Sequence, residues 1–298
     1  MNTSTRPPAA GSGHPPPASG TDGAPPGLTA DTIADSAGGL TFDLAAPPGV
    51  RTTWSAALVL RLRGADAEEV RLPLGPNGAG GLRAVLPSTV ALAEGRWQVY
   101  ADLGDGHAPH RLLPGLNDLR SLVDRRPLAG IGRLGVRIPY TTKLGNLALR
   151  SWLRGPHAEA GDILVERTGM TVEGRLYGAL PGEGAHVEAR ARRTAGEGAT
   201  VTVPLTADGA RFSFTLPYAG PVAHWRGGSD PWDLWLVPAE GAPPVRIGRL
   251  LDDVADKKQI FAYPTMPVPA AGAEVRVGPY YTLDNDLALR VTGPETTG

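Results

Sequence analysis

The chain contains an internal repeat, which limits the folds that its 298 residues can adopt. Residues 139–150, PYTTKLGNLALR, align without a gap with residues 279–290, PYYTLDNDLALR, and seven of the twelve positions are identical. Each copy follows a short β-like run, Val-Arg-Ile or Val-Arg-Val. Half of this chain is long enough to build a hydrophobic core of its own. We therefore predict two copies of one domain, residues 39–156 and 157–298.

Weaker matches extend the repeat towards its start. Trp97 aligns with Trp235, and an Arg-Leu-Leu triplet begins at both Arg111 and Arg249. The offset between matched positions grows from about 130 to about 140 residues, so insertions lie in the loops between matched strands. The remaining matches are Asp118 with Asp256, residues 70–74 with 201–205, and residues 86–87 with 216–217.

Glycine and proline favour a turn-rich β protein. The chain has 40 Gly and 30 Pro, and both residues destabilise helix interiors. From Leu40 onwards, short apolar runs are separated by Gly, Pro and Asp, a pattern typical of sandwich strands. We therefore predict an all-β protein with two tandem immunoglobulin-like β-sandwiches. Each has one short helix, over 112–123 or 249–261, and ends in a hairpin with its turn at 143–146 or 283–286.

The first 38 residues have a different composition. They contain seven prolines and no aromatic residue. Such a segment buries too little apolar surface to offset the entropy lost on ordering. We therefore predict that residues 1–38 form a disordered tail.

Charge and cysteine content exclude several classes of function. The 29 basic and 30 acidic residues balance, so we predict no nucleic-acid partner. The absence of cysteine excludes disulfides, thiolate metal sites and cysteine catalysis. The sequence has no run of 18 apolar residues and no signal-peptide pattern. We therefore expect a cytoplasmic protein without a transmembrane segment, held at the inner membrane face only through a partner.

Three motifs imitate ligand sites, but structural roles explain them better. Residues 130–135 match the dinucleotide pattern G-x-G-x-x-G, yet a strand follows where a helix is needed. Asp284 and Asp286 resemble a metal-binding D-x-D pair, but the other copy has Leu-Gly-Asn there, and a hairpin turn explains both. Two carboxylates and two imidazoles within residues 102–110 fit a solvated loop. We predict no catalytic residue, no cofactor and no metal, with Asp284 and Asp286 as the alternative metal site.

Arginines and aromatic residues are the candidate binding groups, because guanidinium groups bind phosphate and aromatic rings stack on sugars. The predicted polymer-binding residues are Arg111, Arg150, Arg249 and Arg290, which recur in the repeat, and Arg190, Arg192 and Arg193 on a loop gained by the second copy. The predicted sugar-stacking residues are Trp225, Trp232, Tyr280 and Tyr281. Structural alternatives are that the arginines pair with local acids such as Asp118 and Asp256, and that the rings pack in the core.

The closing block of both copies, Pro-Tyr-x-Thr followed by Leu-Ala-Leu-Arg, resembles a known family. It is similar to the C-terminal accessory β-domains of actinobacterial cell-wall polymer transferases, both glycosyltransferases and teichoic-acid-type glycerophosphotransferases. The resemblance covers residues 39–293 and rests on 136–150 and 275–290. In those enzymes a nucleotide-sugar-binding α/β domain precedes the modules, whereas here the 38-residue tail does. The resemblance therefore implies an accessory role without the catalytic domain.

These observations favour a non-catalytic module that assists cell-wall polymer or exopolysaccharide glycosyl transfer. It would bind an anionic glycan, here a cell-wall glycopolymer, or a glycosyltransferase partner. One alternative is a transferase for a nucleotide-activated sugar or polyol phosphate, which requires a metal at Asp284 and Asp286. Another is a structural scaffold, a homo-oligomer that associates through the edge strands of its sheets.

Overall fold

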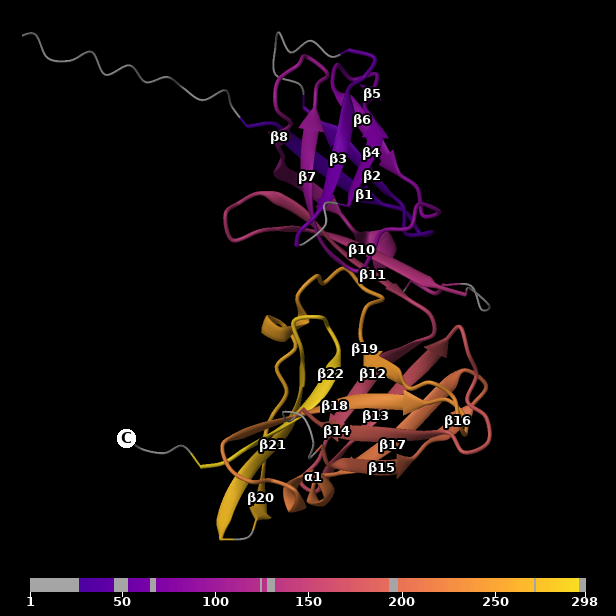
Figure 1. Ribbon diagram of the computed structural model, residues 1–298, viewed down its shortest axis with the longest axis vertical. Coiled ribbons are helices and arrows are strands. Elements are labelled where there is room, and N and C mark those ends of the chain that lie inside the picture. Colours follow the sequence, from indigo (N-terminus) through magenta and orange to yellow (C-terminus); the bar gives the residue numbers. More distant parts are fainter. Residues whose placement is uncertain are drawn as a thin grey trace, which may run out of the picture.

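The protein is all-β in the computed structural model (Figure 1). The structure describes residues 27–45, 53–64, 68–123, 125–127, 132–192, 198–270 and 272–294. No helix within these ranges could span a bilayer, since the one α-helix there, α1 (Ala219–Ala223), has five residues. The architecture is built from strands in two successive sandwiches.

The first sandwich is formed by two sheets. One has the order β5-β6-β2-β1-β9, and the other has the order β10-β11-β7-β3-β4, with β8 paired to β7. The strands of the first sheet are β1 (Thr29–Ala34), β2 (Leu40–Leu44), β5 (Gly75–Pro76), β6 (Leu82–Leu86) and β9 (Leu113–Asp118). The strands of the second are β3 (Ala57–Leu62), β4 (Glu69–Pro73), β7 (Gly95–Asp102), β8 (His110–Arg111), β10 (Leu134–Thr141) and β11 (Leu147–Arg154).

The second sandwich has two layers that the short strand β19 (Val245–Gly248) joins, because β19 pairs with both β12 and β18. One layer has the order β16-β17-β13-β12, and the other has β15-β14-β18-β22-β21-β20. Its strands are β12 (His157–Val165), β13 (Gly169–Tyr177), β14 (His186–Ala191), β15 (Thr200–Pro204), β16 (Thr206–Asp208), β17 (Arg211–Pro217), β18 (Ser229–Val237), β20 (Met266–Ala270), β21 (Ala273–Tyr281) and β22 (Leu287–Thr292).

The strand pairings of the first sandwich recur in the second. Strand β1 pairs antiparallel with β2 and parallel with β9, and β12 pairs in the same way with β13 and β19. Strand β7 lies between β3 and β11, as β18 lies between β14 and β22. The closing hairpins also share their register, since Pro139 faces Leu149 and Pro279 faces Leu289.

The pairings correct the sequence alignment by three residues in β7 and β18. Trp97 faces Leu149 across the ladder, and the residue that faces Leu289 is Trp232, not Trp235. Trp97 and Trp232 are both fully buried, whereas Trp235 is half-buried. Because side chains alternate along a strand, a slip by an odd number of residues exchanges the core face for the outer face.

The three-residue correction also changes which arginines correspond between the two sandwiches. Arg111 faces Tyr100 across the β7–β8 ladder, and Arg246 faces Trp235 across β18–β19. The counterpart of Arg111 in the strand pairings is therefore Arg246, not the Arg249 that the sequence alignment predicts.

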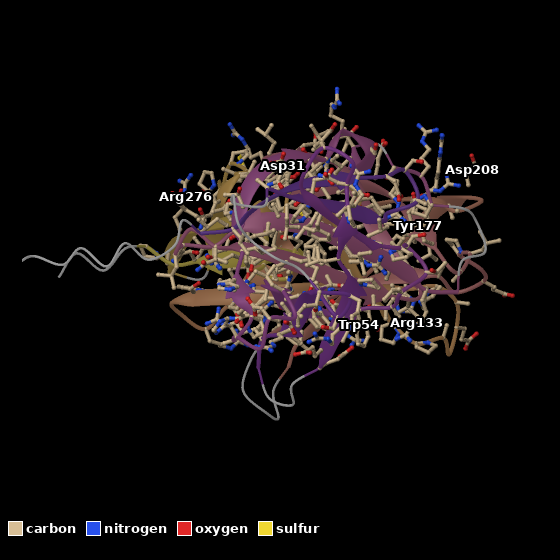
Figure 2. The ribbon with its side chains drawn as sticks, turned by 90° about the horizontal axis from the view of Figure 1, so that it is seen from above. Asp31, Trp54, Arg133, Tyr177, Asp208 and Arg276 are labelled. Carbon is tan, nitrogen blue, oxygen red and sulfur yellow. The ribbon has the colours of Figure 1, made fainter. Side chains whose placement is uncertain are left out.

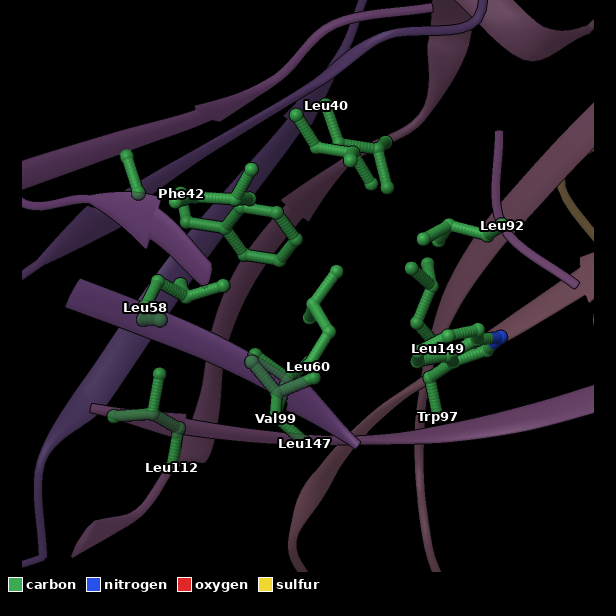
Figure 3. Packing of buried hydrophobic residues seen from close by; sticks show 14 of the residues in the cluster. Leu40, Phe42, Leu58, Leu60, Leu92, Trp97, Val99, Leu112, Leu147 and Leu149 are labelled. Atoms are coloured by element: carbon green, nitrogen blue, oxygen red, sulfur yellow. The ribbon is translucent and has the colours of Figure 1, made fainter. Parts of the chain in front are cut away.

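Two hydrophobic clusters fill the sandwiches. The first contains Phe42, Leu58, Leu60 and Trp97 among its buried side chains (Figure 3). It also contains Leu250, which belongs to the second half of the chain and inserts into the core of the first sandwich. The second cluster extends from Ala158 to Val291. Leu250 therefore links the two sandwiches by a hydrophobic contact.

Part of the predicted tail is ordered. Residues 29–34 form β1, which pairs with β2 and β9, so the prediction of disorder is wrong for this segment. Its inward residues are Ala30, Thr32 and Ala34, which are small and give no strong apolar signal in the sequence. The sheet neighbours supply the apolar surface that the strand itself lacks. The prediction for residues 1–26 falls outside the described residues.

The two predicted helices are largely wrong. Residues 113–118 form β9, and only the 3-10 turn η1 (Arg120–Leu122) is helical there. In the other stretch the helical part is η2 (Lys257–Gln259). Parallel pairing with β1 outweighs the helical pattern of the first stretch, in which Pro114 and Gly115 also disfavour a helix.

Candidate polyanion-binding face

Strands β3 and β7 present one face to the core and one to the outside. Strand β3 buries Leu58 and Leu60, so Arg61 lies on the opposite face of the sheet. Strand β7 buries Trp97 and Val99, and its alternate residues lie outward. These outward residues are Arg96, Gln98, Tyr100 and Asp102.

The strand register collects arginines on this outer face. Arg150 faces Arg96 across the β11–β7 ladder, and the Arg63 backbone amide donates to the Arg96 carbonyl at 2.8 Å. Three arginines therefore lie on three adjacent chain segments at the same level of the sheet. Further along β7, the guanidinium carbons of Arg61 and Arg111 lie 5.0 and 4.9 Å from the centroid of the Tyr100 ring. These cation–π contacts hold both side chains over the sheet.

Carboxylates neutralise only part of this charge. Arg61 pairs with Glu69 at 2.8 Å, and Arg71 on β4 pairs with Asp102 at 2.5 Å. The Arg71 guanidinium holds the pKa of the Asp102 carboxyl below its usual range, and the hydrogen bond from Arg61 does the same for the pKa of Glu69. These acids are therefore ionised at neutral pH, and their arginines are committed to them.

Arg63, Arg96 and Arg111 have no carboxylate partner among the described residues. Arg111 also has a buried Nη1 atom without a hydrogen-bond partner. We call this surface the basic face. It comprises Arg61, Arg63, Arg71, Arg96, Arg111 and Arg150, with Glu69, Asp102 and Asp284 as the carboxylates paired to them.

The arginines predicted from the repeat have different environments. Arg150 is 7% exposed and pairs with Asp284 at 2.5 Å, whereas Arg290 is exposed and stacks over Tyr280 at 4.1 Å. Arg249 pairs with Asp252 at 3.2 Å. Only Arg111 and Arg150 of the predicted set therefore lie on the basic face.

The predicted local acids are the wrong partners. Asp118 pairs with Arg120 at 2.6 Å, and the Asp256 carboxylate accepts from the Lys258 backbone amide at 3.2 Å. Neither acid pairs with a repeated arginine. Asp256 instead caps the 3-10 turn η2, and Asp118 accepts from the Arg120 backbone amide at 3.4 Å, so both carboxylates have local roles.

The arginine cluster of the second sandwich is more fully neutralised. Arg190 lies in strand β14 rather than in a loop, and it pairs with Glu188 at 2.5 Å. Arg192 pairs with Asp233, which also contacts Arg246 at 3.1 Å. Arg193 lies outside the described residues. These carboxylates therefore neutralise Arg190, Arg192 and Arg246, whereas Arg63, Arg96 and Arg111 of the basic face have no such partner among the described residues.

Two of the four predicted sugar-stacking residues are buried. Trp232 and Tyr281 have no exposed surface, because both point into the second core, and the prediction of exposure is wrong for them. Trp225 and Tyr280 are half-buried, and the Trp225 Nε1 donates to the Gly228 carbonyl at 3.1 Å. Side chains alternate between the two faces of strands β18 and β21, and Trp232 and Tyr281 lie on the core faces.

Asp284 and Asp286 contact arginines of the first sandwich. Asp284 accepts from Arg150, and its backbone carbonyl accepts from the Trp152 Nε1 at 3.0 Å. Asp286 accepts from Arg154 at 2.6 Å. In the part of the chain that the structure describes, no three potential His, Cys, Asp or Glu ligands gather. The two aspartates of the D-x-D motif are therefore explained by their ion pairs with arginines of the first sandwich.

Sequence reasoning missed Arg61, Arg63, Arg71 and Arg96. The available signal was the alternation in residues 60–63, 70–74 and 95–101, which places these arginines opposite the apolar positions. What the alternation did not show is that the two strands are neighbours.

Comparisons with known proteins give weak likenesses. No protein-family model matches the sequence, and no curated protein matches it. Among solved structures, S. aureus TarS is similar at 15% identity and a TM-score of 0.38, over 58% of this chain and 29% of TarS. A second structure, of TarS residues 217-571, gives 11% identity and a TM-score of 0.30, over 64% of this chain and 55% of that one.

A pullulanase complexed with maltotriose, from Anoxybacillus sp. LM18-11, gives 12% identity and a TM-score of 0.24. That match covers 71% of this chain and 24% of the pullulanase. The chain spans less than two thirds of the length of each of these three structures. With TM-scores this low, the likenesses carry no argument about function.

Proposed function

We propose that the protein is a non-catalytic accessory module that binds an anionic cell-wall polymer through the basic face. The observation that carries the proposal is the group of three arginines, Arg63, Arg96 and Arg111, without carboxylate partners on one outer sheet face. A phosphate-backbone polymer offers a regular row of anions for such a surface. The similarity of the closing blocks to accessory domains of cell-wall polymer transferases supports this class of polymer over other anions.

We also infer that the two sandwiches are copies of one domain, divided between residues 156 and 157. The recurring strand pairings support this division. Within it, the two outer faces have diverged. The basic face keeps arginines without carboxylate partners, whereas Glu188 and Asp233 pair with the arginines of the β14–β18 face of the second sandwich. We therefore assign polymer binding to the basic face rather than to the β14–β18 face.

The transferase alternative lacks a specific observation in its favour. A metal at Asp284 and Asp286 would have to displace the ion pairs with Arg150 and Arg154. The scaffold alternative is tested by sedimentation.

The test is a titration of the full chain with poly(glycerol phosphate), a neutral glucan and a UDP-sugar with manganese, at low and moderate salt. We expect binding to poly(glycerol phosphate) alone, weakened by salt. Replacing Arg63 and Arg96 together by Gln should weaken it about three- to tenfold, since Arg63 is exposed and Arg96 half-buried, and each ionic contact is screened by solvent.

Replacing Arg175 and Arg211 together by Gln is the matched control, because both are exposed arginines that face each other across strands β13 and β17 of the other sandwich. This control should leave the affinity unchanged. Equal weakening by the two double variants would show that net charge, and not this face, governs binding. Binding to the UDP-sugar would instead support the transferase.

A further inference from the structure

Trp54 is the most exposed large apolar side chain in the described part of the chain, at 99% (Figure 2). It occupies a turn just before β3, at one end of the sheet that carries the basic face. Exposure of an isolated apolar residue is ordinary, but a complete indole in solvent on an ordered turn is unusual for a residue of this size.

The turn around Trp54 is fixed to the neighbouring loop. The Thr53 backbone amide donates to the Leu103 carbonyl at 3.2 Å, and its hydroxyl donates to the Gly104 carbonyl at 3.2 Å. The hydroxyls of Thr53 and Ser55 are 2.7 Å apart. Gly104 has a φ of +71°, and a Cβ there would overlap both hydroxyls. The indole therefore projects from an anchored turn.

The position of this turn relates Trp54 to the basic face. In β3, Ala57 faces Asp102, while Arg61 faces Gln98 four residues further along. At about 3.3 Å per residue, this places the turn about 13 Å or more from the level of Arg61. A polymer that follows β3 and β7 across the arginines therefore reaches Trp54 within a few repeat units.

The side chains at this end of the sheet differ in charge from those of the basic face. Asp105 follows Gly104 and is exposed, so its carboxylate repels phosphate and offers acceptors to hydroxyl groups. An indole face packs against the apolar C–H face of a hexose ring. A neutral sugar fits these two groups better than another anionic unit does.

We propose that Trp54 is the stacking platform for a sugar substituent of the anionic polymer, so that the ligand is a glycosylated phosphate-backbone polymer. This inference rests on the proposed function, because the arginines hold the backbone that brings the sugar to Trp54. It adds a selectivity that the arginines cannot supply, since they contact only the anionic groups.

The test compares Trp54→Ala with the wild type on two ligands, a glycosylated wall polymer and the same polymer stripped of its sugars. We expect about fivefold weaker binding to the glycosylated form and no change for the stripped form, with Trp54→Phe restoring most of the loss. Leu144→Ala, at an 87% exposed position in the β10–β11 turn, is the control. It should bind both polymers as the wild type does.

A spectroscopic readout keeps the test independent of affinity. Trp97, Trp152 and Trp232 are fully buried, so an aqueous quencher reaches Trp54 first among the six tryptophans. The glycosylated polymer should protect Trp54 from acrylamide, and the stripped polymer should not.

Equal loss on both polymers, or no loss on either, would overturn the proposal. A blue shift of Trp54 with anionic lipid vesicles, and none with the glycosylated polymer, would also overturn it in favour of a membrane contact. The stripped polymer tests the arginines alone, so failure of the proposed function and failure of the Trp54 inference give different results.

Discussion

Arg150 and Asp284 form a 2.5 Å ion pair between residues that are 134 positions apart in the sequence. Arg150 ends the repeated block of the first sandwich, and Asp284 lies in the corresponding hairpin turn of the second. The Arg150 side chain is 9% exposed, whereas that of Asp284 is 61% exposed. The acidic turn of one repeat thus compensates a nearly buried charge of the other.

Replacing Asp284 by Asn should destabilise the protein by about 1–2 kcal/mol, because it leaves the Arg150 guanidinium nearly buried without its counterion. The exposure of Asp284 keeps the loss below that of a fully buried pair. Urea unfolding followed by tryptophan fluorescence measures it. Asp208→Asn, at an exposed carboxylate in β16, should change stability by less than about 0.5 kcal/mol.

Leu250→Ala should cost about 2–4 kcal/mol, because Leu250 is fully buried in the first core. Its backbone amide also donates to the Glu159 carboxylate at 2.8 Å, which fixes the segment that carries it. Thermal unfolding should show a lower Tm for the first sandwich in particular. Leu180→Ala serves for comparison, since Leu180 is 66% exposed, and an equal effect there would contradict the role of Leu250.

Glu69→Gln should strengthen binding of poly(glycerol phosphate), because Glu69 contacts both Arg61 and Arg71. Without this carboxylate the basic face gains free positive charge, and we expect about two- to threefold tighter binding at low salt. Glu183→Gln, on an exposed loop of the second sandwich, should have no effect. Unchanged affinity in Glu69→Gln would argue against the basic face as the binding surface.

Acid should weaken the Arg71–Asp102 pair. The hydrogen bond from Arg71 lowers the pKa of Asp102 below the ordinary 3.8. A carboxyl with a lowered pKa in the folded state stabilises the protein above its unfolded-state pKa and loses that contribution as the pH falls through the folded value. The Tm of the wild type should therefore fall more than that of Arg71→Gln between pH 5 and about pH 3. Parallel losses in both proteins would show that the pair contributes nothing.

The closing hairpins illustrate what the sequence determined by itself. The turns are at the predicted positions, with Gly145 at φ 78° and Asn285 at φ 60° in equivalent places. Gly and Asn are the residues that adopt this left-handed conformation most readily, so the turn is encoded locally. The all-β class follows in the same way from alternation and from the density of Gly and Pro, because both act over a few residues.

Tertiary structure decided which side chains are available for function. The sequence around Trp232 and Tyr281 does not distinguish them from exposed aromatic residues. Both are buried, because their side chains lie on the core faces of strands β18 and β21. The free arginines Arg63 and Arg96 became neighbours only when β3 paired with β7. Asp284 gained its partner from the other half of the chain. Burial and charge pairing depend on contacts between distant segments, whereas turns and strands depend on near neighbours.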